Sequence, residues 1–182
     1  NILSYKVLYF ERWKDGLFKA ASEYPIHSLA CISTHDLATL AGWWRGSDIR
    51  LRSETGRQNE AATNRDLAER ERDRRTLLAA LRHENLLAPE LIAAAEGGDL
   101  PERLPHELAL AIHRFGARTR SILFAVQMED MIGSEKQPNL PGTMDEYPNW
   151  RIRSDILLDD LAADERFQAM ARAMRDERPE TP

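Results

Sequence analysis

Three short apolar runs constrain the fold of this chain more than any other feature. They cover residues 7–10, 29–33 and 122–126, and none of them alternates cleanly between apolar and polar positions. Continuous apolar runs of this length are typical of strands buried on both faces, as in a parallel sheet covered by helices. The third run follows apolar residues at helical spacing, so a helix that continues through it is the alternative. We expect a helix that gives way to a strand near Arg120.

Helical patterns fill most of the chain between and after these runs. Residues 66–75 contain eight charged residues of mixed sign, which is typical of a solvated helix face with ion pairs four residues apart. The interleaved acidic residues argue against an RNA-binding basic helix in this segment. A further helix is expected over 90–96, ended by the glycine pair at 97–98. Apolar residues at helical spacing over 167–174 predict a last, partly buried helix, with a frayed tail from Arg178.

The segment 133–153 cannot form a regular element, because it contains three prolines and two glycines. A loop of about twenty residues inside a compact domain is unusual, and such loops often carry function. Helices are expected after this loop, with Ser154 as the cap of the first one.

Composition excludes several classes of protein. Of the 182 residues, 42% are hydrophobic and 30% are charged, and the formal net charge is −5. This profile is typical of a globular chain with a core, and the acidic balance argues against broad nucleic-acid binding. No apolar run approaches the ~20 residues that cross a bilayer. A single cysteine forms no internal disulfide, and Cys31 is interpreted as a small core residue. We therefore expect a soluble, cytoplasmic protein.

The pattern predicts neither a metal site nor a nucleotide site. The histidines share no metal-ligand spacing with one another or with the cysteine, and no glycine-rich phosphate loop is present. We expect no metal and no cofactor. The chain opens at Asn1 and enters its first apolar run almost at once, which favours a piece of a longer protein.

The polar residues after the second apolar run are the best site candidates. His35 and Asp36 follow this run directly, and in α/β folds chemistry is placed just past the carboxyl end of a parallel strand. A carboxylate beside an imidazole, near the paired Trp43 and Trp44, suits a carbohydrate with its vicinal hydroxyls and apolar ring faces. The alternative is that Asp36 caps a helix starting near Leu37, with the tryptophans in the core. The spacing alone leaves both open.

The sequence around these residues also matches a longer pattern. Residues 33–44 read Ser-Thr-His-Asp-Leu-Ala-Thr-Leu-Ala-Gly-Trp-Trp. Other segments of the chain match the same pattern, and all of them occur in the order that the pattern has. They are residues 4–11, 127–133, 137–143 and 146–151. Together they resemble the amylomaltase family, the 4-α-glucanotransferases or disproportionating enzymes, whose corresponding segment is STHD-LPT-xxGWW. Ala38 stands where that family often has proline, and residues 50–107 match no motif.

The resemblance implies a helix-rich α/β chain that forms the C-terminal part of a (β/α)8 TIM barrel with long helical insertions. Residues 1–49 would supply barrel strands and the catalytic-face loop. Residues 50–107 would be a helical insertion. Residues 108–182 would contain the closing helix and strand, the substrate loop and the C-terminal helices, all within one partial barrel domain.

The resemblance also implies a chemistry. The family transfers α-1,4-glucan segments between maltodextrins with retention, which requires a carboxylate nucleophile and a carboxylic acid/base. Asp36 corresponds to the transition-state stabiliser, and substrate-binding roles are implied for His35, Asn139 and Trp43. The nucleophile and the acid/base are implied to lie upstream of the first apolar run. Glu11, at the end of that run, matches neither, so the isolated chain is expected to be inactive.

The expected partner is an α-1,4-glucan or maltodextrin substrate, with no nucleic acid and no membrane. A partial barrel leaves open sheet edges, so the isolated chain is expected to self-associate or to rearrange. The alternative function is a non-catalytic helical interaction or assembly module derived from the barrel, which the charged helix and the open edges would support. An in-frame upstream extension carrying the missing catalytic segments would select the enzyme.

Overall fold

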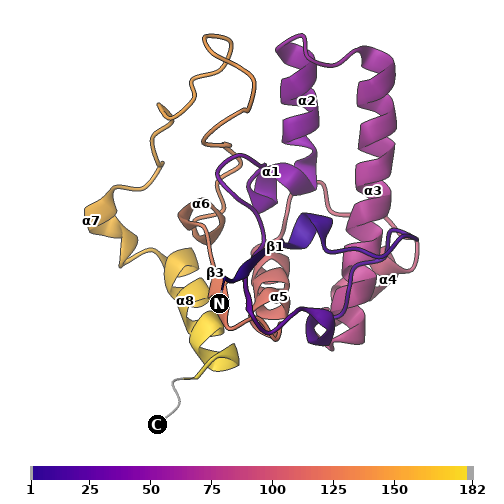
Figure 1. Cartoon of the computed structure of the whole chain (residues 1–182), viewed down its shortest axis with the longest axis vertical. Coiled ribbons are helices and arrows are strands. Elements are labelled where there is room, and N and C mark those ends of the chain that lie inside the picture. The colour runs from indigo at the N-terminus through magenta and orange to yellow at the C-terminus, as the bar shows by residue number, and fades with distance from the viewer. Residues whose placement is uncertain (1, 180–182) are drawn as a thin grey trace.

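A small parallel sheet lies at the centre of the chain (Figure 1). The computed structural model describes residues 2–179. Its strands, in spatial order, are β1 (Ser4–Val7), β2 (Ser28–Cys31) and β3 (Leu123–Ala125). Both pairings are parallel, and their register aligns Tyr5, Leu29 and Leu123 in one row. The three apolar runs therefore supply one sheet, and the chain is helix-rich α/β, as predicted.

Helices form most of the remaining structure. The longer ones are α1 (Leu40–Arg45), α2 (Ser47–Glu54), α3 (Glu60–His83), α5 (His106–Ala117) and α8 (Glu165–Glu177). Single turns form α4 (Ile92–Ala95), α6 (Met128–Met131) and α7 (Leu158–Leu161), with 3-10 turns at Leu8–Phe10, Ala21–Glu23 and Pro89–Leu91. Figure 1 shows α2 and α3 side by side, projecting past one end of the sheet. Within residues 2–179, no helix combines the length and the apolar character needed to cross a membrane.

The first apolar run is only partly a strand. β1 ends at Val7, and residues 8–10, predicted as strand, form a 3-10 turn. Leu8 and Tyr9 are buried in this turn, so side-chain packing outweighs the β propensity of the run. The third run follows its prediction, because α5 ends at Ala117 and β3 comes shortly after.

One face of the sheet packs against α5. Phe124 of β3 lies edge-on to His113, with ring centroids 6.5 Å apart. A Cβ atom on Gly116 would come within 2.4 Å of the Phe124 ring, so this close approach requires glycine. On the opposite face, Tyr5 and Leu123 are 55% and 50% exposed. The apolar runs predict strands that are covered on both faces of the sheet. This prediction is wrong for the described residues, because they cover only the face that packs against α5.

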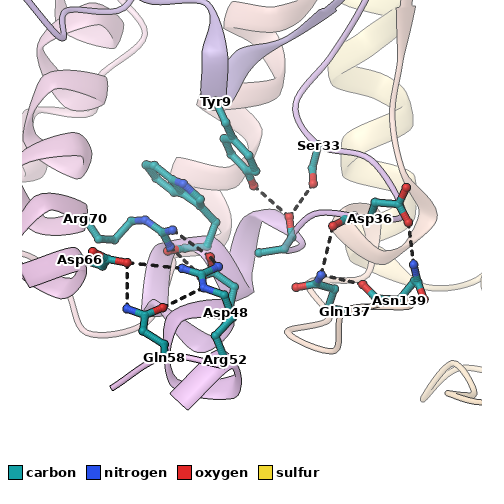
Figure 2. Close-up of polar contacts among 12 residues, drawn as sticks. Tyr9, Ser33, Asp36, Asp48, Arg52, Gln58, Asp66, Arg70, Gln137 and Asn139 are labelled. Atoms are coloured by element: carbon teal, nitrogen blue, oxygen red, sulfur yellow. Dashed lines mark hydrogen bonds and ion pairs between the residues drawn. The ribbon is translucent and has the colours of Figure 1, made fainter. Parts of the chain in front are cut away.

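Helix α3 contains the charged segment and enters the core with its C-terminal half, where Leu77 is fully buried. Arg75 forms the predicted ion pair four residues away, with Glu71 at 2.8 Å. Arg70 instead turns inward and donates to both carboxylate oxygens of Asp48 on α2, at 2.9 and 3.0 Å (Figure 2). The charged face is thus partly solvated and partly used to hold α2.

The structure confirms one predicted helix end and contradicts one predicted helix cap. The helix expected over 90–96 is present as a 3-10 turn followed by α4, and Gly97 ends it with a φ of 111°. Ser154 does not cap a helix. Its hydroxyl oxygen accepts the N–H of Ile156 at 3.2 Å, and α7 begins only at Leu158.

Arg178 is anchored, so the frayed tail predicted from this residue does not begin there. Its guanidinium donates to backbone carbonyls of the α5–β3 connection, those of Ala117 at 2.7 Å, Thr119 at 2.9 Å and Ser121 at 2.8 Å. These carbonyls lie at the end of α5 or just after it, where the helix itself supplies no N–H donors for them. Residues 180–182 of the predicted tail lie outside the described residues.

Candidate active site

The loop between β2 and α1 presents the candidate side chains. β2 ends at Cys31, so His35 and Asp36 lie past its carboxyl end, where both side chains are about half exposed. The carbonyl of Ala38 accepts the Ser33 hydroxyl at 2.5 Å and the Tyr9 hydroxyl at 3.3 Å. Figure 2 shows these two donors converging on one oxygen. The loop is therefore tied back to the core on the side opposite Asp36.

Helix α1 begins later than the sequence suggested. Its N-cap is Thr39, whose hydroxyl oxygen accepts the N–H of Gly42 at 3.1 Å. The N–H of Leu40 is bound by the buried carboxylate of Asp130, from α6, at 2.7 Å. Both capping functions are thus filled by other residues. The alternative of Asp36 as a helix cap is wrong, and its carboxylate stays available for another role.

The irregular segment 133–153 contains no helix or strand, as predicted, and it reaches Asp36. The Asn139 amide donates to Asp36 Oδ1 at 2.7 Å (Figure 2). The buried Gln137 amide donates to the backbone carbonyl of Asp36 at 3.3 Å and to that of Asn139 at 2.6 Å. His35 Nε2 lies 3.3 Å from Asp36 Oδ2. The structure therefore brings together His35, Asp36 and Asn139 from segments about a hundred residues apart.

Trp150 completes this group, although the sequence reasoning gave it no role. Its ring centroid lies 5.2 Å from that of His35, with an angle of 46° between the rings. The residue is 66% exposed and has a φ of 60°, which places its backbone in the left-handed region. The available signals were a large aromatic residue in a segment without regular structure and its place in the family-like segment 146–151. Gln137 carried no comparable signal, because its role depends on the tertiary contact.

The paired tryptophans lie in the core. Trp43 is 4% exposed, and its ring stacks on Tyr9 with centroids 5.0 Å apart. The Arg70 guanidinium lies 4.8 Å from the centroid of the same ring. Trp44 is fully buried and donates to the carbonyl of Pro101 at 2.9 Å. The structure gives no support to Trp43 as a substrate contact, and the core interpretation of the pair holds.

Other acidic and nucleophilic groups near the sheet are engaged elsewhere. Glu11 is buried between Lys19 at 2.7 Å and Lys6 at 3.3 Å, so both of its oxygens are paired. Burial raises the pKa of the Cys31 thiol, although a hydrogen bond with Tyr5 acts in the other direction. A neutral, buried thiol is a poor nucleophile. Cys31 is a core residue, as predicted.

The fold and this site fit one class of protein, the α/β folds that place polar side chains just past the carboxyl end of a parallel strand. The chain belongs to the 4-alpha-glucanotransferase family, whose family model matches residues 1–158.

Individual relatives agree with this assignment. The chain is 36% identical over 150 residues to a 4-alpha-glucanotransferase of Haemophilus influenzae, an alignment covering 82% of the chain and 21% of the relative. It is 33% identical over 185 residues to a 4-alpha-glucanotransferase of Mycobacterium bovis, covering 96% of the chain and 24% of the relative. The chain therefore spans less than a quarter of the length of these relatives.

Solved structures give the same result. The amylomaltase of Corynebacterium glutamicum superposes with a TM-score of 0.81 at 30% identity, over 95% of this chain and 25% of that one. An amylomaltase of Streptococcus agalactiae in complex with acarbose reaches a TM-score of 0.59 at 14% identity, over 99% of this chain and 28% of that one. The second likeness concerns the fold alone.

Proposed function

We propose that this chain is the C-terminal part of a 4-α-glucanotransferase that transfers α-1,4-glucan segments between maltodextrins with retention. The observation that carries the proposal is the hydrogen bond between Asn139 and the Asp36 carboxylate, which joins two segments that resemble motifs of the family. It fixes a carboxylate at the end of a parallel strand while leaving its side chain half exposed. This is an arrangement suited to gripping a sugar hydroxyl.

In the proposed mechanism, Asp36 stabilises the transition state. Retention passes through an oxocarbenium-like transition state on either side of a covalent intermediate. Hydrogen bonds from the sugar's vicinal hydroxyls to Asp36 would strengthen as positive charge develops on the ring, so they would lower the barrier more than they tighten substrate binding. His35 would hold the same glucose, and Asn139 would orient the Asp36 carboxylate. Trp43 would support the loop from the core.

The same proposal assigns the chain to a (β/α)8 barrel. Three observations support it. The strands pair in parallel, they lie in the sheet in the same order as along the chain, and the chain is similar to an amylomaltase structure. Residues 1–49 would contribute strands and the catalytic-face loop, 50–107 the helical insertion, and 108–182 the closing strand, the substrate loop and the last helices. One hydrophobic cluster joins Leu8, Leu77 and Ile112 from these three parts, in agreement with a single domain.

The nucleophile and the acid/base would lie upstream of the first apolar run, residues 7–10. We therefore expect the isolated chain to release no glucose from maltotriose, whereas an extended protein with the upstream sequence restored transfers glucosyl units. Sequencing the coding region before Asn1 gives the first check, because the proposal requires an in-frame extension. We place the complete enzyme in the cytoplasm, and the free, buried thiol of Cys31 is compatible with a reducing compartment.

The decisive experiment replaces Asp36 by Asn in the extended protein. We expect turnover of maltotriose to fall by orders of magnitude with a modest change in KM, because the lost charge matters mainly in the transition state. Asp145→Asn, at an exposed aspartate of the irregular segment 133–153, is the matched control and should retain activity. An active Asp36→Asn enzyme, or glucose release by the isolated 182 residues, would contradict the proposal.

The alternative of a non-catalytic helical module is less well supported. It rests on the charged face of α3 and on the open sheet edges. The open edges are present among the described residues, but on α3 Arg70 is paired with Asp48 and Asp73 forms a salt bridge with Arg12. Gln58 and Arg52 extend the same network between α2 and α3 (Figure 2). Much of the charge that would meet a protein partner is thus used inside the chain.

A further inference from the structure

We propose that Trp150 is the platform on which a glucose ring of the glucan stacks beside Asp36. This inference rests on the proposed function and assigns a sugar-binding surface to a residue outside the motif that carries His35 and Asp36.

The backbone of Trp150 is held in an unfavourable conformation. A φ of 60° is rare for a bulky residue, and such a conformation persists only where the surroundings impose it. The Trp150 N–H donates to the carbonyl of Pro138 at 3.0 Å. The preceding residue, Asn149, accepts the N–H of Leu140 at 2.8 Å and donates to the Thr143 hydroxyl at 2.8 Å. The loop is thus braced at Trp150 and at the residue before it, and the indole of Trp150 remains exposed.

The direction of the indole is what suggests a ligand. A strained residue that packs in a core would gain burial in return, but the described residues of this chain leave Trp150 66% exposed. Its ring lies 5.2 Å from His35, which in turn lies 3.3 Å from the Asp36 carboxylate. An aromatic face next to a histidine and a carboxylate matches a pyranose, which has an apolar C–H face and a polar hydroxyl rim.

Other exposed apolar side chains do not share this setting. Met144 and Leu157 are also exposed, but their backbones lie outside the left-handed region that Trp150 occupies. Trp13 is exposed to a similar degree, yet its Nε1 donates to Glu23 at 3.3 Å and Lys19 lies over its ring. Trp13 therefore serves as a matched control for Trp150.

The first test is a fluorescence titration of the extended protein with maltotriose. We expect an emission change that persists in Trp13→Phe and is lost in Trp150→Phe, since only the second substitution removes the indole at the sugar. An unchanged response in Trp150→Phe would overturn the inference.

The second test separates binding from folding by comparing Trp150→Gly with Trp150→Phe. Glycine accepts the left-handed backbone, so the melting temperature should stay the same or rise. KM for maltotriose should rise about threefold to tenfold, the range of one aromatic contact, with kcat nearly unchanged. Trp150→Phe keeps an aromatic face and should restore most of the affinity. A lower melting temperature with an unchanged KM would indicate a structural role and overturn the inference.

The two proposals fail in different ways. An extended protein that binds maltotriose through Trp150 but transfers no glucosyl unit contradicts the proposed function and leaves this binding surface in place. An active transferase whose fluorescence response survives Trp150→Phe contradicts the surface and leaves the function in place.

Discussion

Asp130 shows how a residue without contact to the proposed substrate can set the geometry of the site. Its Oδ1 accepts the first N–H of α1, on Leu40, immediately after the loop that carries Asp36. Its Oδ2 lies 3.7 Å from His113 Nε2, and both atoms are buried without a hydrogen-bond partner among the described residues. His113 Nδ1 lies 2.8 Å from the Ala109 carbonyl, which can only accept, so Nδ1 carries the proton.

Replacing Asp130 by Ala should destabilise the chain. The substitution leaves the Leu40 N–H buried without an acceptor, which costs about 2–4 kcal/mol of unfolding free energy. Asp130→Asn keeps an acceptor for Leu40 and offers an N–H to His113, so its cost should be less than half as large. Denaturant unfolding of the two variants measures both values. Equal losses would show that the hydrogen bond to Leu40 is not what Asp130 contributes.

At this scale, the sequence could suggest candidate residues only where they follow an apolar run or match a family motif. His35 and Asp36 follow an apolar run, and Asn139 came from the resemblance. The spacing of Trp43 could not predict its burial, because a tryptophan at helical spacing can pack in the core or face a substrate site. The Gln137 contact with Asp36 depends on two segments meeting in space, which no local pattern encodes.

At the scale of elements, α8 is held against α5 by charge as well as by packing. Met170 is fully buried in this contact, and Glu177 receives hydrogen bonds from Arg114 at 2.9 Å and Arg118 at 2.8 Å. Burial alone would raise the pKa of Glu177, but these hydrogen bonds outweigh burial and lower it. The amphipathic stripe predicted the helix and its buried face, whereas the arginine partners, on another helix, had no local signal.

The lowered pKa predicts a defined pH dependence for the α5–α8 contact. Because the pKa of Glu177 is lower in the folded chain, its stabilisation is present above the unfolded value of about 4.3 and is lost as the pH falls through the folded value. Glu177→Gln should therefore lower the unfolding free energy by about 1 kcal/mol at neutral pH. The difference between variant and parent should shrink in acid.

The control for this prediction is Asp176→Asn. Asp176 contacts the same Arg114 at 3.1 Å but is largely exposed, so its substitution should have a smaller effect. Thermal unfolding across a pH series measures both variants. A Glu177→Gln difference that is constant from neutral to acidic pH would rule out the charge of Glu177 as its source.

The whole molecule has a sheet whose outer strands are unpaired on one side within the described residues. β1 and β3 each have a free edge, and Tyr5 and Leu123 leave an apolar row half exposed on the face opposite α5. Open edges and apolar faces of this kind pair with other chains. In the proposed barrel, further strands would occupy these edges.

The isolated chain should therefore self-associate. We expect size-exclusion chromatography to show a species larger than a 20.8 kDa monomer, and Leu123→Lys to shift it toward monomer by placing a charge at the β3 edge. Leu158→Lys, on the exposed α7, is the matched control and should change nothing. A monomer that persists through dilution would contradict the prediction.

The contact between Asn139 and Asp36 closes a loop of 103 residues, and this has a consequence for folding. Closing a long loop costs entropy before the contact returns any stability, and parallel pairing over such separations is slow. Helices α3 and α5 need only local contacts, so we expect them to form first. During synthesis, Asp36 leaves the ribosome long before Asn139 exists, so the candidate site is assembled last.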